Sequence, residues 1–534
     1  MNGKTIYYHG RITTLDPSQP LAEAAVVERG RIVAVGETKQ LLLDHGRAQV
    51  NKVDLQGGYV YPGFVDSHLH LSGVGQRLRW LDLGTCRSKA ELLQAIKRRV
   101  VTSKEGEWIL GMGLDGNRLQ GGAPTLEELD EASPHHPVLL ARVCLHAHLV
   151  NSAAYRAAGI TEATAPSEGG VFGRDGNGRL NGWVYEQASQ PFYAAQPAPS
   201  YHEKKETIRQ AMKQALACGL TGGHSEDLRY IGNVGELVRI YRELVDEGVK
   251  FRTHHLLYHP YLAELDELEP TELAPNPWVR LGAVKIFADG SIGGRTALMS
   301  APYADDPSQI GVAIHEQAEL LDLARRAAAY GRPIAVHAIG DEAARRVIET
   351  MEQVPAPAGE LRHRLIHGQF LRADLIARLH RLDVVVDIQP RFVASDFPWV
   401  LERVREQRIA YAYAWKTLLE TGIPCAAGSD APIEPLHPLL GMHAAVTRRR
   451  LEDPDTHPGY LPEQKLQPLA ALRLFTQGSA YAEGMEKERG VIAVGRWADL
   501  TVYDRDLLQC PAEEWIEAKT VCTVVNGQIA YDGR

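Results

Sequence analysis

Apolar and polar positions alternate on two length scales through the middle of this 534-residue chain. Short apolar runs of strand length alternate with longer stretches of helical periodicity. The predicted strands are 251–257, 283–287, 333–337, 365–367, 384–388 and 425–428. The predicted helices are 204–218, 235–247, 316–330, 341–353 and 373–382. Such alternation is typical of parallel β/α units, and it predicts a doubly wound sheet or a (β/α)8 barrel.

The two ends of the chain have a different pattern, in which short strand-like runs are separated by turn residues. These runs are 5–8, 24–28, 31–35, 491–494, 498–503, 520–525 and 528–531. Asn526-Gly527 is in addition a two-residue hairpin signal. We therefore expect one small β domain assembled from both termini. A stretch rich in Gly and Pro, 75–200, interrupts the β/α alternation and predicts a long insertion after the first barrel strand.

Polar residues recur at the carboxyl ends of the apolar runs. They are His68, His70, Lys285, Asp289, His337, His367 and Asp430. In a parallel barrel these strand ends open on one face, where catalytic groups converge. A satisfied polar group in the core is the alternative for any one of them. Their recurrence in register at several strand ends favours a functional site.

His68 and His70 are the most informative pair. Residues i and i+2 of a strand point to the same side, so the two imidazoles can bind one metal ion together. Imidazole and carboxylate ligands suit Zn²⁺, Mn²⁺ or Fe²⁺. An isolated His-x-His is common by chance, but here Gly-Phe-Val-Asp precedes it at the end of an apolar run.

Composition narrows the class of protein. The formal net charge is -9, and no stretch is dense in Lys and Arg, which argues against nucleic-acid binding. The six cysteines form no C-x-x-C pair, which argues against a cysteine zinc knuckle and a disulfide scaffold. Neither a signal-peptide pattern nor an apolar run of membrane-spanning length is visible. We expect a cytoplasmic protein with no membrane partner.

Several motifs resemble those of the amidohydrolase superfamily. They are residues 62–70 (PGFVDSHLH), 284–291 (VKIFADGS), 336–341 (VHAIGD), 428–432 (GSDAP) and 490–500 (GVIAVGRWADL). Those in the middle of the chain are closest to the branch of YtcJ-like and N-substituted formamide deformylase-like proteins (amidohydrolase family 3). Further matches to that branch in the insertion are His146, Asn151, 158–160, 169–170, 181–182 and Glu186. The resemblance covers essentially the whole chain. It implies a (β/α)8 barrel over residues 63–485, with a β-sandwich domain built from 1–62 and 486–534.

The resemblance also implies a set of metal ligands. His68, His70 and Asp430 would bind one divalent ion, His337 and His367 a second, and zinc is the first choice. Lys285 matches the position of a carbamylated lysine, whose carboxylate would bridge the two ions. A protonated amine cannot bind a metal, so the alternative is an ion pair of Lys285 with Asp289 or Asp430 and one metal ion. Asp430 would also act as the catalytic base for a metal-activated water.

Residues of the substrate pocket are harder to predict. His146, Arg295, Gln389, Arg391 and Trp399 could face the metal from loops, since loops at this end of a barrel carry specificity. A structural role is the alternative for each, such as a loop anchor for Arg295. His224 and Glu226 are weaker candidates. The pairs His135-His136 and His254-His255 are not expected to bind metal, because strand neighbours point to opposite faces.

The predicted function is hydrolysis of a C–N bond of amide type in a small molecule, for example an N-acyl or N-formyl amine. A mononuclear deaminase of a heterocycle is the alternative enzyme, and a non-catalytic binding protein on the same barrel is the alternative of another class. Deaminases of this superfamily usually lack the fourth-strand lysine, so Lys285 favours the amide. No motif places a serine or cysteine nucleophile. A homodimer is the default expectation for the assembly.

Overall fold

The computed structural model describes residues 3–116, 119–142, 147–166, 170–274, 276–405 and 408–534. The chain forms two compact units. One combines Met1–Val74 with Ile208–Arg534, and the other is Gly75–Thr207. The second unit corresponds closely to the insertion predicted over 75–200.

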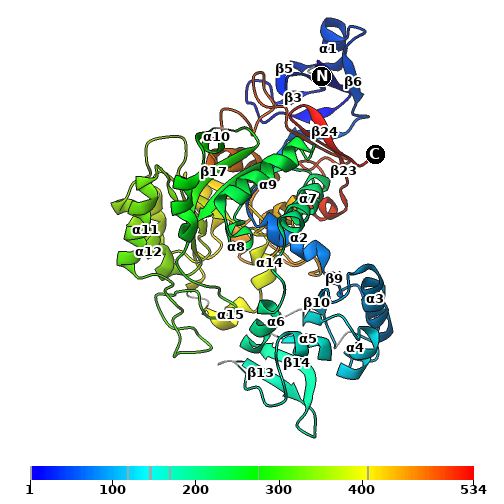
Figure 1. Ribbon diagram of the computed structural model, residues 1–534. Coiled ribbons are helices and arrows are strands. Elements are labelled where there is room, and N and C mark those ends of the chain that lie inside the picture. The colour runs from blue at the N-terminus through cyan, green and yellow to red at the C-terminus, as the bar shows by residue number, and fades with distance from the viewer. Residues whose placement is uncertain (1–2, 117–118, 143–146, 167–169, 275, 406–407) are drawn as a thin grey trace. The chain divides into compact units, whose positions relative to one another are not determined.

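The first unit contains a nearly closed barrel of eight parallel strands (Figure 1). In spatial order the strands are β8 (Phe64–Leu69), β15 (Leu220–Ser225), β16 (Arg252–Tyr258), β17 (Val279–Phe287), β18 (Ile334–Ala338), β19 (His363–His367), β20 (Val384–Ile388) and β21 (Cys425–Ala427). Every strand follows its neighbour in sequence order, as in a (β/α)8 barrel. The predicted fold class is confirmed.

Helices follow most of the strands and cover the outside of the barrel (Figure 1). They include α7 (Tyr201–Ala217), α8 (Leu228–Ile231), α9 (Val234–Asp246), α11 (Gln317–Ala329), α12 (Asp341–Gln353), α13 (Ala373–Leu379), α16 (Trp415–Glu420), α17 (Pro438–Thr447) and α18 (Pro468–Arg473). In α9 the Asn233 side chain caps the first turn by accepting from the Glu236 amide, and the apolar residues are buried along one face. After α7 the chain turns at Gly219, whose φ of 88° favours glycine.

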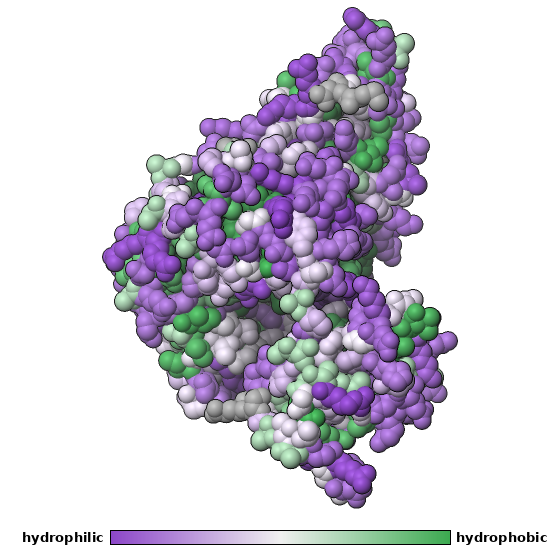
Figure 2. Space-filling model, in the orientation of Figure 1, coloured by the Kyte–Doolittle hydropathy of each residue, from purple (hydrophilic) through white to green (hydrophobic). Residues whose placement is uncertain are grey.

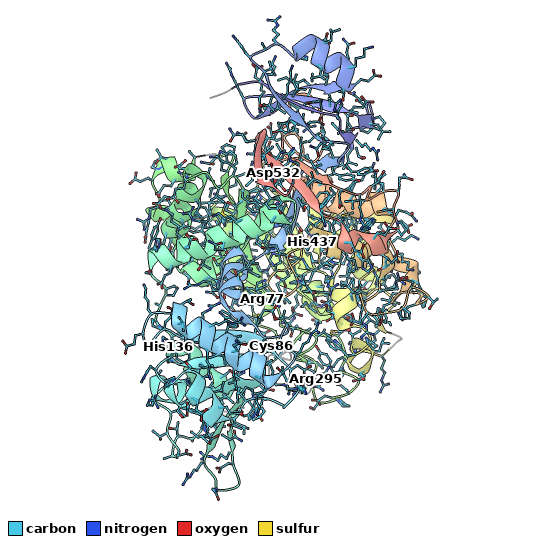
Figure 3. The ribbon with its side chains drawn as sticks, turned by 90° about the vertical axis from the view of Figure 1, so that its right-hand side faces the viewer. Arg77, Cys86, His136, Arg295, His437 and Asp532 are labelled. Carbon is cyan, nitrogen blue, oxygen red and sulfur yellow. The ribbon has the colours of Figure 1, made fainter. Side chains whose placement is uncertain are left out.

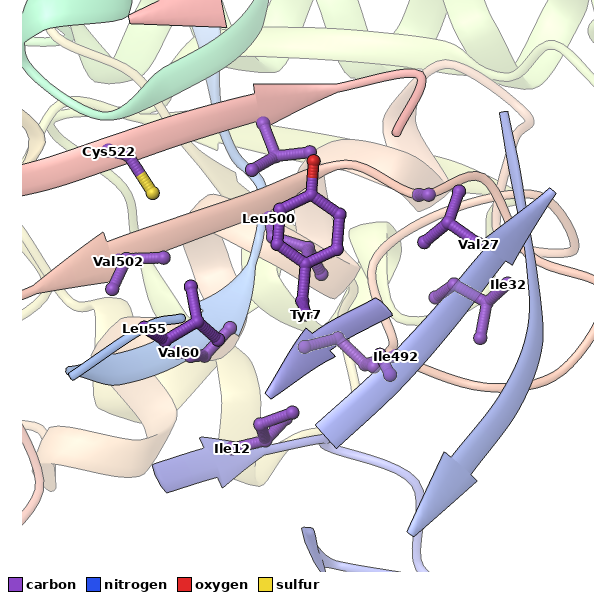
Figure 4. Close-up of a cluster of buried hydrophobic side chains, with 13 residues drawn as sticks. Tyr7, Ile12, Val27, Ile32, Leu55, Val60, Ile492, Leu500, Val502 and Cys522 are labelled. Atoms are coloured by element: carbon purple, nitrogen blue, oxygen red, sulfur yellow. The ribbon is translucent and has the colours of Figure 1, made fainter. Parts of the chain in front are cut away.

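Strands from both ends of the chain pair in one β domain. One sheet has the order β5 (Arg31–Gly36), β4 (Ala24–Glu28), β1 (Thr5–Tyr8), β6 (Asn51–Asp54). The other has the order β24 (Gln528–Asp532), β23 (Thr520–Val525), β22 (Leu500–Tyr503), β7 (Tyr59–Pro62), β2 (Arg11–Thr13), β3 (Leu21–Ala22). Their shared core includes Tyr7, Ile32, Val60, Leu500 and Cys522 (Figure 4). The domain boundaries given above, 1–62 with 486–534 and 63–485, stay a prediction.

The strand predicted over residues 491–494 is wrong. That segment is a loop between Gly490 and Gly495, both of which have a φ of 88°. The Ile492 amide donates to the Thr14 carbonyl at 2.8 Å, and the Ile492 side chain is buried in the core of the β domain. The apolar pattern therefore reflects burial of one side chain rather than a strand.

The insertion has its own sheet and two apolar clusters. The sheet has the order β13 (Gly170–Arg174), β14 (Leu180–Glu186), β12 (Ala147–Val150), β11 (Val138–Arg142), β10 (Ile109–Leu114), β9 (Leu81–Asp82). Its helices include α3 (Lys89–Thr102), α4 (Leu126–Ala132), α5 (Ser152–Ala157) and α6 (Gln190–Ala194). The insertion is thus a folded unit with a core of its own, which its Gly and Pro content did not predict.

The surface shown in Figure 2 is predominantly hydrophilic, with apolar residues scattered among polar ones. Within the described ranges, every helix is too short or too polar to cross a membrane.

Candidate metal centre

Three of the predicted ligands meet at the carboxyl end of the barrel. One ligand atom from each of His68, His70 and Asp430 lies within 4.8 Å of the others, and all three residues are buried. The Asp430 Oδ1 atom is 3.2 Å from His70 Nε2 and 3.5 Å from His68 Nε2. Two imidazoles and a carboxylate at this spacing form a donor set that suits a divalent transition metal.

Asp430 is held in place by bonds between the last and first barrel strands. Its amide donates to the His68 carbonyl at 2.7 Å, and the Ser429 hydroxyl donates to Asp66 Oδ2 at 2.5 Å. Asp430 has a φ of 57°, a left-handed conformation that costs a residue with a side chain about 1–3 kcal/mol. Gly428 is required beside it, because a Cβ there would lie 2.4 Å from the His68 nitrogen. Such a locally unfavourable backbone is often found at functional sites.

His68 on β8 and His70 directly after it face different neighbours. His70 Nδ1 lies 2.7 Å from the Glu226 carbonyl oxygen and can donate to it, so Nε2, which faces Asp430, is the nitrogen left for a metal. Burial lowers the pKa of His70, but Asp430 and Glu226 outweigh that effect and raise it. His68 Nε2 faces the Lys285 amine at 3.1 Å, and its Nδ1 is buried with no hydrogen-bond partner among the described residues.

Lys285 lies at the centre of the site and is completely buried on β17. Burial lowers the pKa of its amine to about 7. Within the described part of the chain no carboxylate lies close enough to form an ion pair with it, and its amine forms a hydrogen bond with His68. The ion pair with Asp289 or Asp430 considered above is therefore not present in this structure.

His337 and His367 form the other side of the site. Their ring centroids are 4.5 Å apart, and the His367 ring is 5.9 Å from the ring of His68. His367 Nδ1 lies 2.6 Å from Gln389 Oε1, so its Nε2 is the nitrogen left for a metal. His337 Nε2 lies 3.0 Å from the Gly290 carbonyl oxygen, which leaves Nδ1. His367 also has a left-handed φ, 73°.

Asp289 supports His337 rather than Lys285. Its carboxylate accepts from the backbone amides of Leu298, Ile339 and Gly340 and lies 3.4 Å from His337 Nε2. Burial raises its pKa to about 7. A carboxylate with these partners fixes the loops that follow β17 and β18.

The predicted pocket residues differ in their surroundings. Arg295 lies on the loop after β17 (labelled in Figure 3) and is bound to Asp305, which also pairs with Arg403. This favours the loop-anchor interpretation. Arg391 pairs with Glu434 at 3.1 Å. Trp399 lies over Gly293, and its indole nitrogen donates to the Ser395 carbonyl.

The remaining candidates differ in their relation to the metal centre. Gln389 binds His367, as given above, and His146 lies outside the described residues. The His224 ring lies beside His254, 5.0 Å away, and His255 packs against Tyr241 of α9. The two adjacent histidines of β16 thus point to opposite sides of the barrel wall, as predicted.

Asn151 of the insertion and Glu226 of the barrel have roles that the sequence did not reveal. Asn151 caps α5 and donates to the carbonyls of Ser133 and His136, so its match to the family reflects local structure. Glu226 was a weak candidate as a ligand, but its backbone oxygen orients His70 and its carboxylate binds Arg229. The position of Glu226 directly after a buried strand was the one feature of the sequence that pointed to a role in the site.

Comparison with known proteins agrees with this geometry. The family model for the amidohydrolase family matches residues 52–531 of this sequence. The chain belongs to the amidohydrolase family. Its barrel carries the buried His68, His70 and Asp430 cluster at the strand ends where this fold places catalytic groups.

Relatives of this amidohydrolase match over nearly its whole length. It is 42% identical to amidohydrolase YtcJ of Bacillus subtilis (strain 168), over 99% of both chains. It is 26% identical to the N-substituted formamide deformylase of Arthrobacter pascens, over 98% of this chain and 97% of that one. A metal-dependent hydrolase from Pyrococcus furiosus has a similar structure, with a TM-score of 0.77, 29% identity, and coverage of 95% and 100% of the two chains.

Replacing Gln389 by Leu should weaken metal binding in this amidohydrolase. The change removes the partner of His367 Nδ1, and loss of such a partner typically costs about 10- to 100-fold in metal affinity. Competition with a chromophoric chelator measures the affinity. Gln464→Leu is the control, because Gln464 is also buried but binds Thr417 instead. Equal metal affinity in the Gln389 and Gln464 variants would refute the positioning role.

Proposed function

We propose that this amidohydrolase cleaves a C–N bond of amide type in a small molecule, with an N-formyl or N-acyl amine as substrate. The observation that carries the proposal is the buried Lys285 amine, which lies 3.1 Å from His68 Nε2 and has no carboxylate within ion-pair distance among the described residues. The similarity to an N-substituted formamide deformylase supports the same bond type.

The residues fit a pair of divalent metal ions. His68, His70 and Asp430 would hold one ion, and His337 and His367 the other. Each of His70 and His367 has one ring nitrogen beside an oxygen acceptor, which leaves the other nitrogen as a ligand atom. When bound, the ions supply Lewis acidity, which lowers the pKa of a water molecule and polarises the substrate carbonyl.

Lys285 would complete the donor set after reaction with CO2. An amine must be neutral to attack CO2, and burial with a pKa of about 7 leaves much of the Lys285 amine neutral at neutral pH. The nitrogen forms a bond to carbon and loses a proton, which yields a carbamate. The carbamate would supply carboxylate-type oxygen ligands on a long side chain, which would help to hold both ions.

Asp430 would move the proton during hydrolysis. Burial raises the pKa of its carboxyl group, but the hydrogen bond with His70 and the neighbouring positive charges outweigh that effect and keep the pKa below its usual range. The ionised carboxylate can take the proton of the attacking water and pass it to the leaving nitrogen.

The experiment is a turnover assay with N-formyl and N-acyl amines on protein supplied with Zn²⁺ and bicarbonate. We expect release of formate or the acid, loss of release after chelation, and recovery when Zn²⁺ is returned. Release of ammonia from heterocyclic amines, with no cleavage of the acyl amines, would contradict the proposal and support the deaminase alternative.

A further inference from the structure

Arg229 lies at the edge of the metal site in a fixed position. It belongs to α8, directly after β15, and its Nε donates to Glu226 Oε2 at 2.7 Å. Glu226 is fully buried, and its other carboxylate oxygen accepts from the Arg229 amide. The guanidinium carbon lies 4.6 Å from the centroid of the Phe287 ring and 6.0 Å from that of Tyr258. One carboxylate and two aromatic rings therefore define where the cation sits.

The same neighbours connect Arg229 to the proposed metal ligands. The Glu226 carbonyl oxygen lies 2.7 Å from His70 Nδ1. The Phe287 ring lies 5.3 Å from the His337 ring, and the Lys285 nitrogen is 4.8 Å from its centroid. Arg229 thus contacts two residues, Glu226 and Phe287, that themselves contact proposed metal ligands.

The free end of this cation points to a ligand. Glu226 engages only Nε and the backbone amide, and neither terminal nitrogen of Arg229 has a hydrogen-bond partner in the part of the chain that the structure describes. The side chain is 39% exposed. By contrast, Arg295 binds Asp305 through two nitrogens. Arg391 binds Glu434 through Nε, as Arg229 binds Glu226, but its Nη1 is buried.

An arginine that is fixed through Nε and has unengaged terminal nitrogens among the described residues is suited to bind a carboxylate. Its two terminal nitrogens present parallel N–H groups in a planar fork that matches the two oxygens of a carboxylate. Burial tends to lower the pKa of Arg229, but Glu226 outweighs it, so the group stays charged. Phe287 and Tyr258 add apolar surface beside the fork.

We propose that Arg229 binds a carboxylate of the substrate, so that the substrates are N-acylated amino acids rather than neutral N-acyl amines. The inference rests on the proposed function, since it concerns the substrate of that same site. Arg229 is then a substrate-binding residue that selects for the anionic group, while the metal ligands act on the amide bond.

The test uses matched substrate pairs. N-formyl derivatives of glycine, β-alanine and γ-aminobutyrate are compared with their neutral carboxamides, which differ only in the negative charge. Both kcat/KM and calorimetric binding are measured on metal-loaded wild type, Arg229→Met and Arg229→Lys. Arg378→Met is the control, because Arg378 pairs with Glu352 on the helical surface.

We expect wild type and the Arg378 variant to prefer at least one acid over its amide. Arg229→Met should lose about 10- to 100-fold in kcat/KM and affinity for that acid, the range expected for a charge-assisted hydrogen-bonded pair. Its rates with the amides and its metal content should stay near wild type, and Arg229→Lys should recover part of the preference. Absence of any acid preference in wild-type binding, or its persistence in Arg229→Met, would overturn the inference. Lack of turnover with every compound would count against the proposed function. The binding of acids and amides to wild type and the Arg229 variants would still test the role of Arg229.

Discussion

Replacing Asp430 by Asn should reduce kcat by about 10²- to 10⁴-fold, the contribution typical of a general base. The amide has nearly the same shape, but it cannot take a proton from water. The main-chain bond from Asp430 to the His68 carbonyl and the Asp66–Ser429 bond do not involve the Asp430 carboxylate, so the fold should be retained. Turnover, circular dichroism and metal content are measured together.

Asp374→Asn provides the control for this substitution, because Asp374 lies on the surface of α13 and pairs with Arg372. It should leave kcat unchanged. A near-wild-type rate in Asp430→Asn would refute the role of Asp430 as base. If Asp430→Asn retains its metal, a lower rate reports the loss of the proton acceptor. If it loses metal, the lower rate reports the loss of a metal ligand instead.

Replacing Lys285 by Ala should lower the metal content from about two ions per chain towards about one, with loss of turnover. The variant removes the nitrogen that would become the bridging carbamate, but it leaves His68, His70 and Asp430 in contact. It also leaves space beside His68, because the lysine side chain is completely buried. A small carboxylate such as formate or propionate added to the variant should therefore restore part of the second ion.

The measurement is elemental analysis of the variant, purified with and without the added carboxylate. Lys487→Ala is the control, since Lys487 is not part of the metal site. An unchanged metal content in Lys285→Ala would show that this side chain does not bridge two ions, and the mononuclear alternative would then be favoured.

The parts of the site that lie on strands were predictable from the sequence. His68 and His70 point the same way because they are two residues apart at a strand end, and the parallel ladder brings His367 and Asp430 to the same edge. Parallel β/α units were predictable from periodicity, and the resemblance to the amidohydrolase superfamily then favoured the barrel over a doubly wound sheet. Strand length and helical periodicity are local properties of the chain, and β/α alternation leaves few topologies open.

The partners of side chains beyond the strand ends were not predictable. Arg295 and Arg229 are both arginines beyond a strand end, yet Asp305 binds one through two nitrogens and Glu226 binds the other through Nε alone. That difference depends on how the loops fold back, which periodicity does not encode. The contact of Gln389 with His367 was likewise not predicted, and its contact with substrate stays a prediction.

The most direct test of the account is the metal content of the wild-type chain, purified without chelator and in the presence of bicarbonate. The account predicts about two divalent transition-metal ions per chain, held by His68, His70, Asp430, His337, His367 and a carbamylated Lys285. A chain that binds no metal, even after addition of Zn²⁺ or Mn²⁺, would contradict it.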